Sequence, residues 1–228
     1  MRSATLELPV VTTIDPQPIK PRLRGWLHAA AAPLALVVGI VLICLTPTIA
    51  GKVASAIFAL TSVMLFSTSA TYHLGHWSVR TKAVLRRLDH SNIFLLIAGT
   101  YTPLAVLLLD RKPMIILLSV IWSGALIGLL ARVLWIGAPR WLYVPIYIAL
   151  GWVAVIYLPA FARGGGEAVV WLIIAGGLAY TLGAVVYGLK RPNPLPRWFG
   201  FHEIFHLFTL IAFACHATAI MIAAVALR

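Results

Sequence analysis

Five polar residues in three distant parts of the sequence have types and spacings suited to a metal site. His202 and His206 are four residues apart, so on an α-helix their imidazoles lie on one face, one turn from each other. Two zinc ligands on one helix commonly show this spacing. Ser69 and His73 repeat it in a second segment, and Asp89 lies in a third.

The chemistry that this set predicts is zinc-dependent hydrolysis. Three imidazoles, from His73, His202 and His206, form a typical catalytic zinc set that leaves a fourth tetrahedral position for water. Zinc lowers the pKa of such a water to about 7, and a carboxylate such as Asp89 can orient the water or carry its proton. The Ser69 hydroxyl can donate a hydrogen bond to a carbonyl oxygen on which negative charge develops. We therefore expect zinc as the cofactor, with Asp89 and Ser69 as catalytic residues.

The elements that must position these residues are membrane helices. The chain is 61% hydrophobic and 11% charged, against about one-half and one-quarter in soluble domains. A membrane span needs about 20 apolar helical residues, because lipid offers the backbone no hydrogen-bond partners. The sequence predicts an all-α membrane protein, a seven-transmembrane helical bundle over 26–228, preceded by a flexible cytoplasmic arm at 1–25. The predicted spans are 27–49, 53–75, 91–109, 113–134, 141–161, 167–189 and 202–226.

The distribution of basic residues predicts how the bundle is oriented. Cytoplasmic loops retain Lys and Arg, and thirteen of the eighteen fall on the side that holds the N-terminus. The N-terminus is therefore expected in the cytoplasm and the C-terminus outside. His73, Asp89 and the pair His202/His206 then lie at similar depth near the cytoplasmic boundary. The net charge of +12 follows from this topology, so we expect no nucleic-acid partner.

The other ionisable residues near the membrane have simpler interpretations. A lone histidine at an interface is more often an anchor or an interhelical hydrogen-bond partner than a ligand. His76 and His90 adjoin basic residues and are expected to face solvent or lipid headgroups, as is His28. His216 is expected near mid-membrane in a buried interhelical hydrogen bond, or else lining a lipid-accessible cavity. Glu203 points about 100° away from His202 and is expected to support the site or to lie at a helix interface.

The motifs together resemble those of the hemolysin III family, the bacterial branch of the progestin and adipoQ receptor superfamily, which includes alkaline ceramidases. The resemblance extends over essentially all the predicted spans. It implies a seven-helix bundle and zinc held by His73, His202 and His206, with Asp89 at the aspartate that binds the metal's water and Ser69 beside the site. The motifs that carry it are Ser-x3-His at 69–73, Leu-Asp-His-Ser at 88–91, Ala-Gly-Thr-Tyr-Thr-Pro at 98–103 and His-x3-His at 202–206.

The resemblance also implies a function, with alternatives. Superfamily members hydrolyse the amide of ceramides, so a lipid amidohydrolase of the bacterial inner membrane is expected, with a membrane lipid as partner and an acyl amide or ester as substrate. A second class is a non-enzymatic sensor, receptor-like or cytolytic protein with a structural zinc. A third is haem-mediated electron transfer, which is disfavoured because His202 and His206 share one helix face and cannot clamp a flat ring. Nothing in the sequence indicates an oligomeric state.

Overall fold

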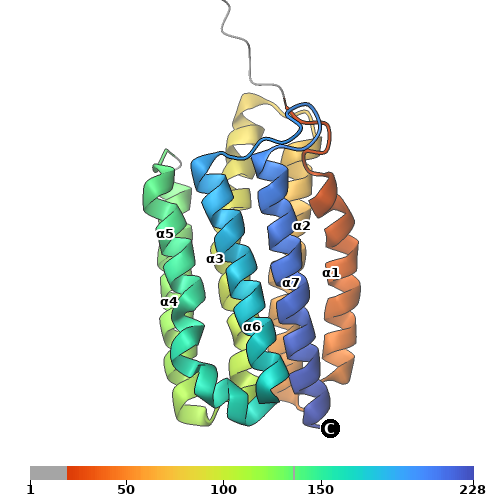
Figure 1. Cartoon of the computed structure of the whole chain (residues 1–228), viewed down its shortest axis with the longest axis vertical. Helices are drawn as coiled ribbons and strands as arrows, with labels where there is room; N and C mark the ends of the chain where they lie inside the picture. The colour runs from red at the N-terminus through yellow and green to blue at the C-terminus, as the bar shows by residue number, and fades with distance from the viewer. Residues whose placement is uncertain (1–19, 136) are drawn as a thin grey trace, which may run out of the picture.

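The computed structural model describes residues 20–135 and 137–228, and this part of the chain folds into a bundle of long helices (Figure 1). Of the predicted arm at 1–25, residues 1–19 lie outside the described part of the chain. The elements are α1 (Trp26–Leu45), α2 (Ile49–Leu74), α3 (Val79–Leu108), α4 (Arg111–Leu134), α5 (Arg140–Gly151), the 3₁₀ helix η1 (Trp152–Tyr157), α6 (Leu158–Leu189) and α7 (Phe201–Ala226).

Six helical stretches of the described chain are long and apolar enough to cross a membrane, not the seven predicted. The difference arises in Arg140–Leu189, a continuous stretch of 50 residues in which α5, η1 and α6 follow one another without a loop. A straight helix of that length would measure about 75 Å, far more than the roughly 30 Å of hydrocarbon. The stretch instead folds back on itself near Gly166, whose backbone is non-helical with φ of 80°.

The return of this stretch is fixed by hydrogen bonds between its two arms. Arg140 Nη1, at the start of α5, donates to the backbone oxygen of Tyr187 near the end of α6 at 2.8 Å. Trp152 Nε1 donates to Thr181 Oγ1, also at 2.8 Å. The arms are therefore antiparallel, and Figure 1 shows α5 and α6 side by side.

Helix α3 begins twelve residues before the predicted span at 91–109, and this changes the surroundings of Asp89. The Ser78 side chain caps the helix by accepting a hydrogen bond from the Thr81 N–H at 3.2 Å. The basic residues that follow are good helix formers, so the helix extends beyond the apolar stretch. Asp89 and His90 consequently lie inside a helix and not in a loop that leads into one.

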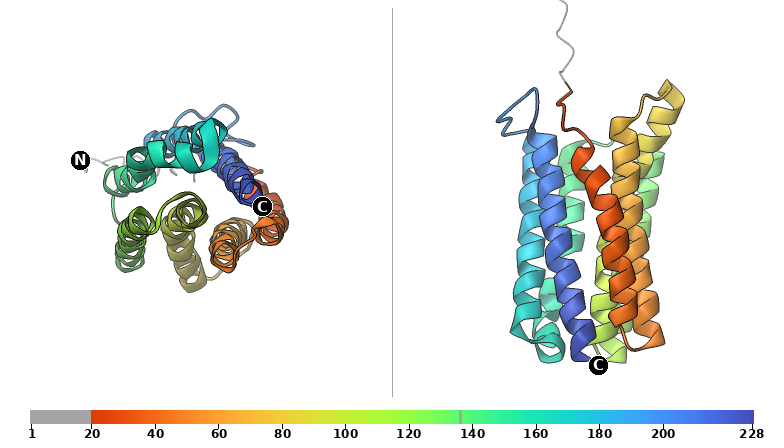
Figure 2. Two further views of the ribbon diagram at one scale, coloured as in Figure 1. Left: turned by 90° about the horizontal axis from the view of Figure 1, so that it is seen from below. Right: turned by 90° about the vertical axis from the view of Figure 1, so that its right-hand side faces the viewer.

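The two ends of the bundle differ in composition. The segments 20–25, 75–78, 137–139 and 190–200, which adjoin most of the basic residues, lie at one end, and the C-terminus lies at the other (Figure 2). A chain that starts at one end and finishes at the other crosses the bundle an odd number of times, which here requires the reversal within Arg140–Leu189. We refer to the end that holds 20–25 as the basic end.

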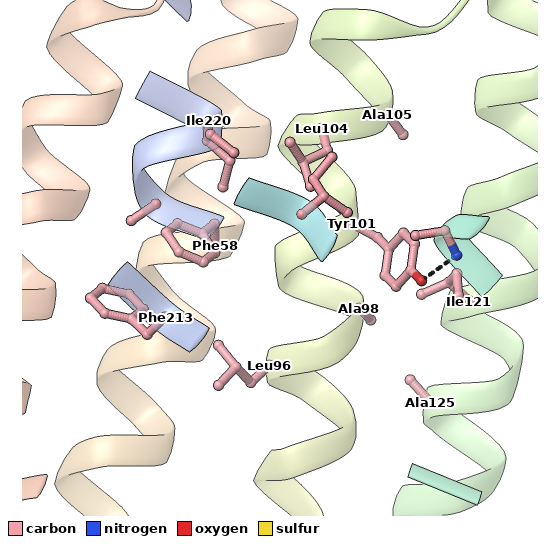
Figure 3. Packing of buried hydrophobic residues seen from close by; sticks show 14 of the residues in the cluster. Phe58, Leu96, Ala98, Tyr101, Leu104, Ala105, Ile121, Ala125, Phe213 and Ile220 are labelled. Atoms are coloured by element: carbon pink, nitrogen blue, oxygen red, sulfur yellow. Dashed lines mark hydrogen bonds between the residues drawn. The ribbon is translucent and has the colours of Figure 1, made fainter. Parts of the chain in front are cut away.

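The interior is filled by aromatic and small aliphatic side chains, whereas large apolar side chains also cover the outside. Phe58 on α2 stacks on Phe213 of α7, with ring centroids 5.5 Å apart (Figure 3). Phe213 also meets Phe66 edge-on. The outward residues include Leu34, Leu60, Ile127, Trp171 and Leu182, each more than half exposed. Such an apolar surface is suited to lipid, so the chain is a multi-pass membrane protein.

Candidate metal centre

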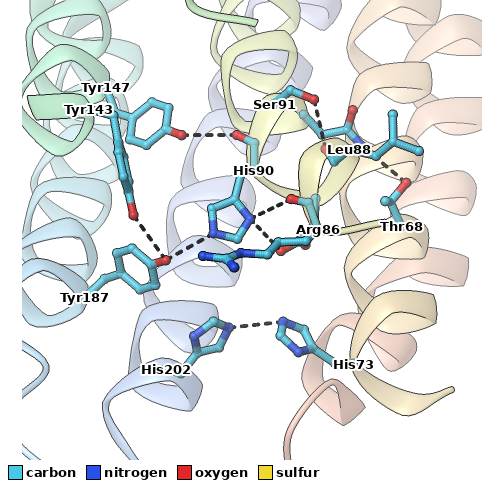
Figure 4. Close-up of polar contacts among 12 residues, drawn as sticks. Thr68, His73, Arg86, Leu88, His90, Ser91, Tyr143, Tyr147, Tyr187 and His202 are labelled. Atoms are coloured by element: carbon cyan, nitrogen blue, oxygen red, sulfur yellow. Dashed lines mark hydrogen bonds and ion pairs between the residues drawn. The ribbon is translucent and has the colours of Figure 1, made fainter. Parts of the chain in front are cut away.

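Three histidines from two helices meet at the basic end of the bundle. The candidate ligand nitrogens of His73, at the end of α2, and of His202 and His206, in the first two turns of α7, all lie within 4.8 Å of one another. The three side chains are buried, and the Nε2 atoms of His73 and His202 are 3.1 Å apart (Figure 4). Side-chain contacts between α2 and α7 thus bring together two residues that are 129 positions apart in the chain.

The donor set fits a zinc ion. Two imidazole nitrogens bound to zinc at about 2.0–2.1 Å and related by a tetrahedral angle are about 3.3 Å apart, close to the observed Nε2 separation. Among the described residues the group contains three imidazoles and no thiolate or carboxylate. Three nitrogen ligands with one position left open are typical of catalytic zinc sites. That these three residues bind a metal stays a prediction.

The structure places the predicted catalytic residues beside this group without making them part of it. Ser69 and Asp89 line the same internal cavity as His202 and His206. Ser69 Oγ is buried and lies near the Asp89 carboxylate, but it makes no hydrogen bond of standard geometry in the described chain. Asp89 Oδ2 lies 3.4 Å from Nδ1 of His90. The hydroxyl and the carboxylate are therefore available to a molecule in the cavity, and their catalytic roles stay predictions.

His28 differs from expectation: it is not solvated but only 2% exposed. Its ring stacks on that of His206, with centroids 3.8 Å apart and planes 12° apart, and neither of its nitrogens has a hydrogen-bond partner among the described residues. The expectation failed because α1 packs against α7, which places the side chain of His28, in the first turn of α1, inside the bundle. Its position at the same end of the bundle as His73 was the sequence signal that could have revealed it.

His90 is likewise buried, against the prediction that it faces solvent. Its Nδ1 lies 2.9 Å from the Arg86 backbone oxygen, and its Nε2 lies 3.2 Å from the Tyr187 hydroxyl (Figure 4). The Tyr147 hydroxyl donates to the His90 backbone oxygen at 3.1 Å, and the Tyr143 hydroxyl is 3.5 Å from that of Tyr187. The early start of α3 explains the error, because it brings His90 into the bundle.

The tyrosines of this network were not identified from the sequence. Tyr143 and Tyr147 are four residues apart on α5, and this spacing, which puts both rings on one helix face, was a sequence signal that could have identified them. Two arginines pack on their rings: the Arg132 guanidinium lies 4.3 Å from the centre of the Tyr143 ring, and that of Arg140 lies 4.3 Å from the Tyr187 ring. Arg132 is only 3% exposed, so this cation–π contact is desolvated.

Residues 20–25 and Glu203 cover the three-histidine site from the basic end. Glu203 is fully buried, pairs with Arg24, and accepts a hydrogen bond from the Gly200 N–H at 2.8 Å. Lys20 Nζ donates to the His73 backbone oxygen at 2.5 Å. Glu203 thus supports the site, as predicted, by fixing the start of α7. His76 is exposed, as predicted.

A long internal cavity extends from the site into the bundle. Its walls come mostly from α3, α5, η1, α6 and α7, with a few residues from α1 and α2, and are mostly aliphatic and aromatic. His216 lines this cavity, with its Nδ1 buried and without a partner in the described chain. The expected interhelical hydrogen bond of His216 is therefore absent from the described residues, and the alternative of a cavity-lining residue holds.

Comparison with known proteins relates most of the chain to a single family. Residues 17–217 match the family described as Haemolysin-III related. The chain is 32% identical over 160 residues to a hemolysin-3 homolog of Bacillus subtilis, covering 69% of this chain and 71% of that protein. It is 30% identical to hemolysin-3 of Bacillus cereus, and the match covers 72% of this chain and 71% of that protein. An adiponectin receptor protein of Drosophila melanogaster is 29% identical, covering 72% of this chain and 41% of the receptor.

Proposed function

The chain belongs to the Haemolysin-III related family, and from this premise we propose that it is an intramembrane zinc-dependent hydrolase of lipid amide or ester bonds. The observation that carries the proposal is the meeting of His73, His202 and His206 at one end of a long apolar cavity. A metal site alone suits many roles. A metal site beside an internal cavity with mostly apolar walls suits a lipid whose carbonyl lies at the metal and whose chain enters the cavity.

The residues around the site have distinct tasks in this reaction. Zinc held by three imidazoles supplies Lewis-acid polarisation of a carbonyl and a more acidic water. The Asp89 carboxylate accepts a proton from the attacking water and returns it to the leaving nitrogen or oxygen. Ser69 Oγ, which has no partner in the described chain, donates a hydrogen bond to the carbonyl oxygen as its charge grows. The apolar cavity walls bind the acyl chain and exclude bulk water.

The same proposal includes the place of the protein in the cell. We place it in the bacterial inner membrane with the N-terminus in the cytoplasm and the C-terminus outside, and with a membrane lipid as its partner. The clustering of basic segments at one end of the bundle supports this orientation. The three-histidine site then lies close to the cytoplasmic headgroups.

Substituting Asp89 tests the proposal, because it separates metal binding from turnover. The purified wild-type protein is expected to contain about one zinc per chain and to hydrolyse at least one member of a panel of acyl amides and esters. Asp89→Asn should keep the zinc and lose at least about 100-fold in turnover, the usual effect of removing a general base. Asp110→Asn, at the start of α4, is the matched control and should change neither quantity.

Two outcomes would contradict the proposal. Protein without zinc would remove the cofactor, and undiminished turnover in Asp89→Asn would remove that carboxylate from the reaction. Zinc-loaded protein with no turnover against the whole panel would instead favour a cytolytic or receptor-like protein with a structural zinc. The names of the relatives, hemolysin-3 and adiponectin receptor protein, favour that second function.

A further inference from the structure

A second polar patch lies deep in the cavity, away from the three histidines. His216 on α7 and Tyr180 on α6 both line the cavity, with nearly parallel rings whose centroids are 5.8 Å apart. The His216 Nδ1 atom and the Tyr180 hydroxyl are both buried, and neither has a hydrogen-bond partner in the described part of the chain. Two orphaned polar groups thus face one apolar space.

These two groups are exceptions on this stretch of the wall. Buried polar groups are nearly always hydrogen-bonded, because an unpaired one loses its water without compensation. The other hydroxyl-bearing side chains of this stretch each donate to a backbone carbonyl; they are Thr100, Tyr101, Thr181 and Thr209. Ser69 and His28, the other cavity-lining residues with unpartnered polar atoms, belong to the three-histidine end, so on this stretch the lack of partners is confined to His216 and Tyr180. It indicates a ligand atom that would complete them.

The surrounding helices make room for this pair. Gly176 on α6 faces the His216 ring, and a Cβ at this position would lie 2.6 Å from His216 Nε2. A residue with any side chain would displace the imidazole from the cavity wall. The absence of a side chain at position 176 therefore keeps His216 in place.

The depth of the pair along the cavity sets where a ligand atom must lie. His216 is ten residues beyond His206 on the same helix, about 15 Å along its axis. An extended hydrocarbon chain with C–C bonds of about 1.5 Å advances about 1.25 Å per carbon, so this distance corresponds to about 12 carbons. A lipid whose carbonyl lies at the three-histidine site would bring the middle of its chain to Tyr180 and His216.

We propose that His216 and Tyr180 form a subsite for an oxygen atom carried in the middle of the acyl chain, such as a hydroxyl group. A neutral imidazole and a phenol can each donate and accept, so together they match a hydroxyl, which also does both. This inference rests on the proposed function only in taking an acyl chain as the occupant of the cavity. It narrows the substrate class to lipids with an oxygenated chain.

Competition binding to the purified full-length protein tests the subsite without requiring turnover. The protein is loaded with tritiated stearate, and unlabelled stearate, 12-hydroxystearate or 2-hydroxystearate is added in turn as the competitor. 12-Hydroxystearate should bind about tenfold more tightly than stearate, as expected for one or two new hydrogen bonds in a dry site. 2-Hydroxystearate should show no such preference, because its hydroxyl lies at the three-histidine end.

Two variants and one matched control assign the preference to the pair. Tyr180→Phe removes only the hydroxyl and His216→Phe removes both ring nitrogens, and each should lower the preference for 12-hydroxystearate to about twofold or less while stearate still binds. Tyr101→Phe makes the same change in the same cavity, but its hydroxyl already donates to the Gly151 backbone oxygen at 2.6 Å. It should leave the preference at its wild-type value.

The results that would overturn the subsite differ from those that would overturn the hydrolase. Equal affinity for stearate and 12-hydroxystearate, or a preference unchanged in both variants, would mean that only water satisfies His216 and Tyr180. Failure of both fatty acids to bind would remove the acyl chain from the cavity and the subsite with it. A preserved preference in protein without zinc or turnover would refute the hydrolase and leave the subsite standing.

Discussion

At the scale of single residues, a histidine in this protein is distinguished by what its ring nitrogens face. Those of His73, His202 and His206 face one another, whereas those of His28 face no partner in the described chain. His76 lies at the same end of the bundle but is exposed. Burial alone therefore does not separate a candidate ligand from a packing residue, since His28 is as buried as His206. The direction in which the ring nitrogens point does separate the two kinds of residue.

Replacing His28 by phenylalanine tests this distinction. The variant keeps a ring against His206 but removes two buried nitrogens that lack partners, so we expect full zinc content and a gain in unfolding free energy of about 1 kcal/mol. His206→Ala should lose the metal, and His76→Ala should keep it. Zinc per chain and the thermal midpoint in detergent measure both effects. Loss of zinc from His28→Phe would make His28 a fourth ligand.

At the scale of elements, the start of α7 depends on one buried carboxylate. Glu203 ties α7 to residues 20–25 through Arg24 and closes the first turn through the Gly200 N–H. Glu203→Gln leaves the Arg24 guanidinium without its charged partner, and it should lower the unfolding free energy by about 1–3 kcal/mol. Glu167→Gln, at an exposed position of α6, is the control and should change it by less than about 0.5 kcal/mol. A fall in the thermal midpoint for both variants alike would contradict this role.

The contact between α2 and α3 depends on a glycine. A Cβ at Gly99 would collide with the Thr61 side chain, whose hydroxyl is held by the backbone oxygens of Ile57 and Phe58. Gly99→Ala should therefore force the helices apart and cost about 1–3 kcal/mol of stability. Gly151→Ala is the matched control, because no atom lies within 4 Å of its added Cβ. Equal thermal midpoints for the two variants would show that α2 and α3 adjust freely.

At the scale of the whole molecule, the two ends of the bundle are predicted to face different compartments. The basic end holds residues 20–25 and, at the end of α2 and the start of α7, the three histidines. The C-terminus lies at the other end. We expect alkaline phosphatase fused after Arg228 to be active, because this enzyme folds only outside the cytoplasm. The same enzyme inserted after Asn193, in the segment between α6 and α7, should be inactive. The reverse activities would invert the orientation.

Much of this organisation was determined by local sequence. Apolar stretches of about 20 residues can only be helices in lipid, so the bounds of α4 and α7 were predicted to within two residues. The spacing of His202 and His206 likewise fixed their common face, because helical periodicity depends on nothing else in the chain. The family, too, was predicted from short motifs and confirmed over residues 17–217.

Tertiary structure alone decided the rest. The antiparallel return of Arg140–Leu189 depends on contacts such as Arg140 with Tyr187, which join residues 47 apart. The sequence therefore predicted two separate spans where the described chain has one continuous helical stretch that reverses, one of six stretches long and apolar enough to cross a membrane. Burial of His28 and His90, and the lack of partners at Tyr180 and His216, depend on which helix faces which. Local sequence fixes where a side chain lies along its helix, but only packing fixes the rotation of each helix about its axis and hence what the side chain meets.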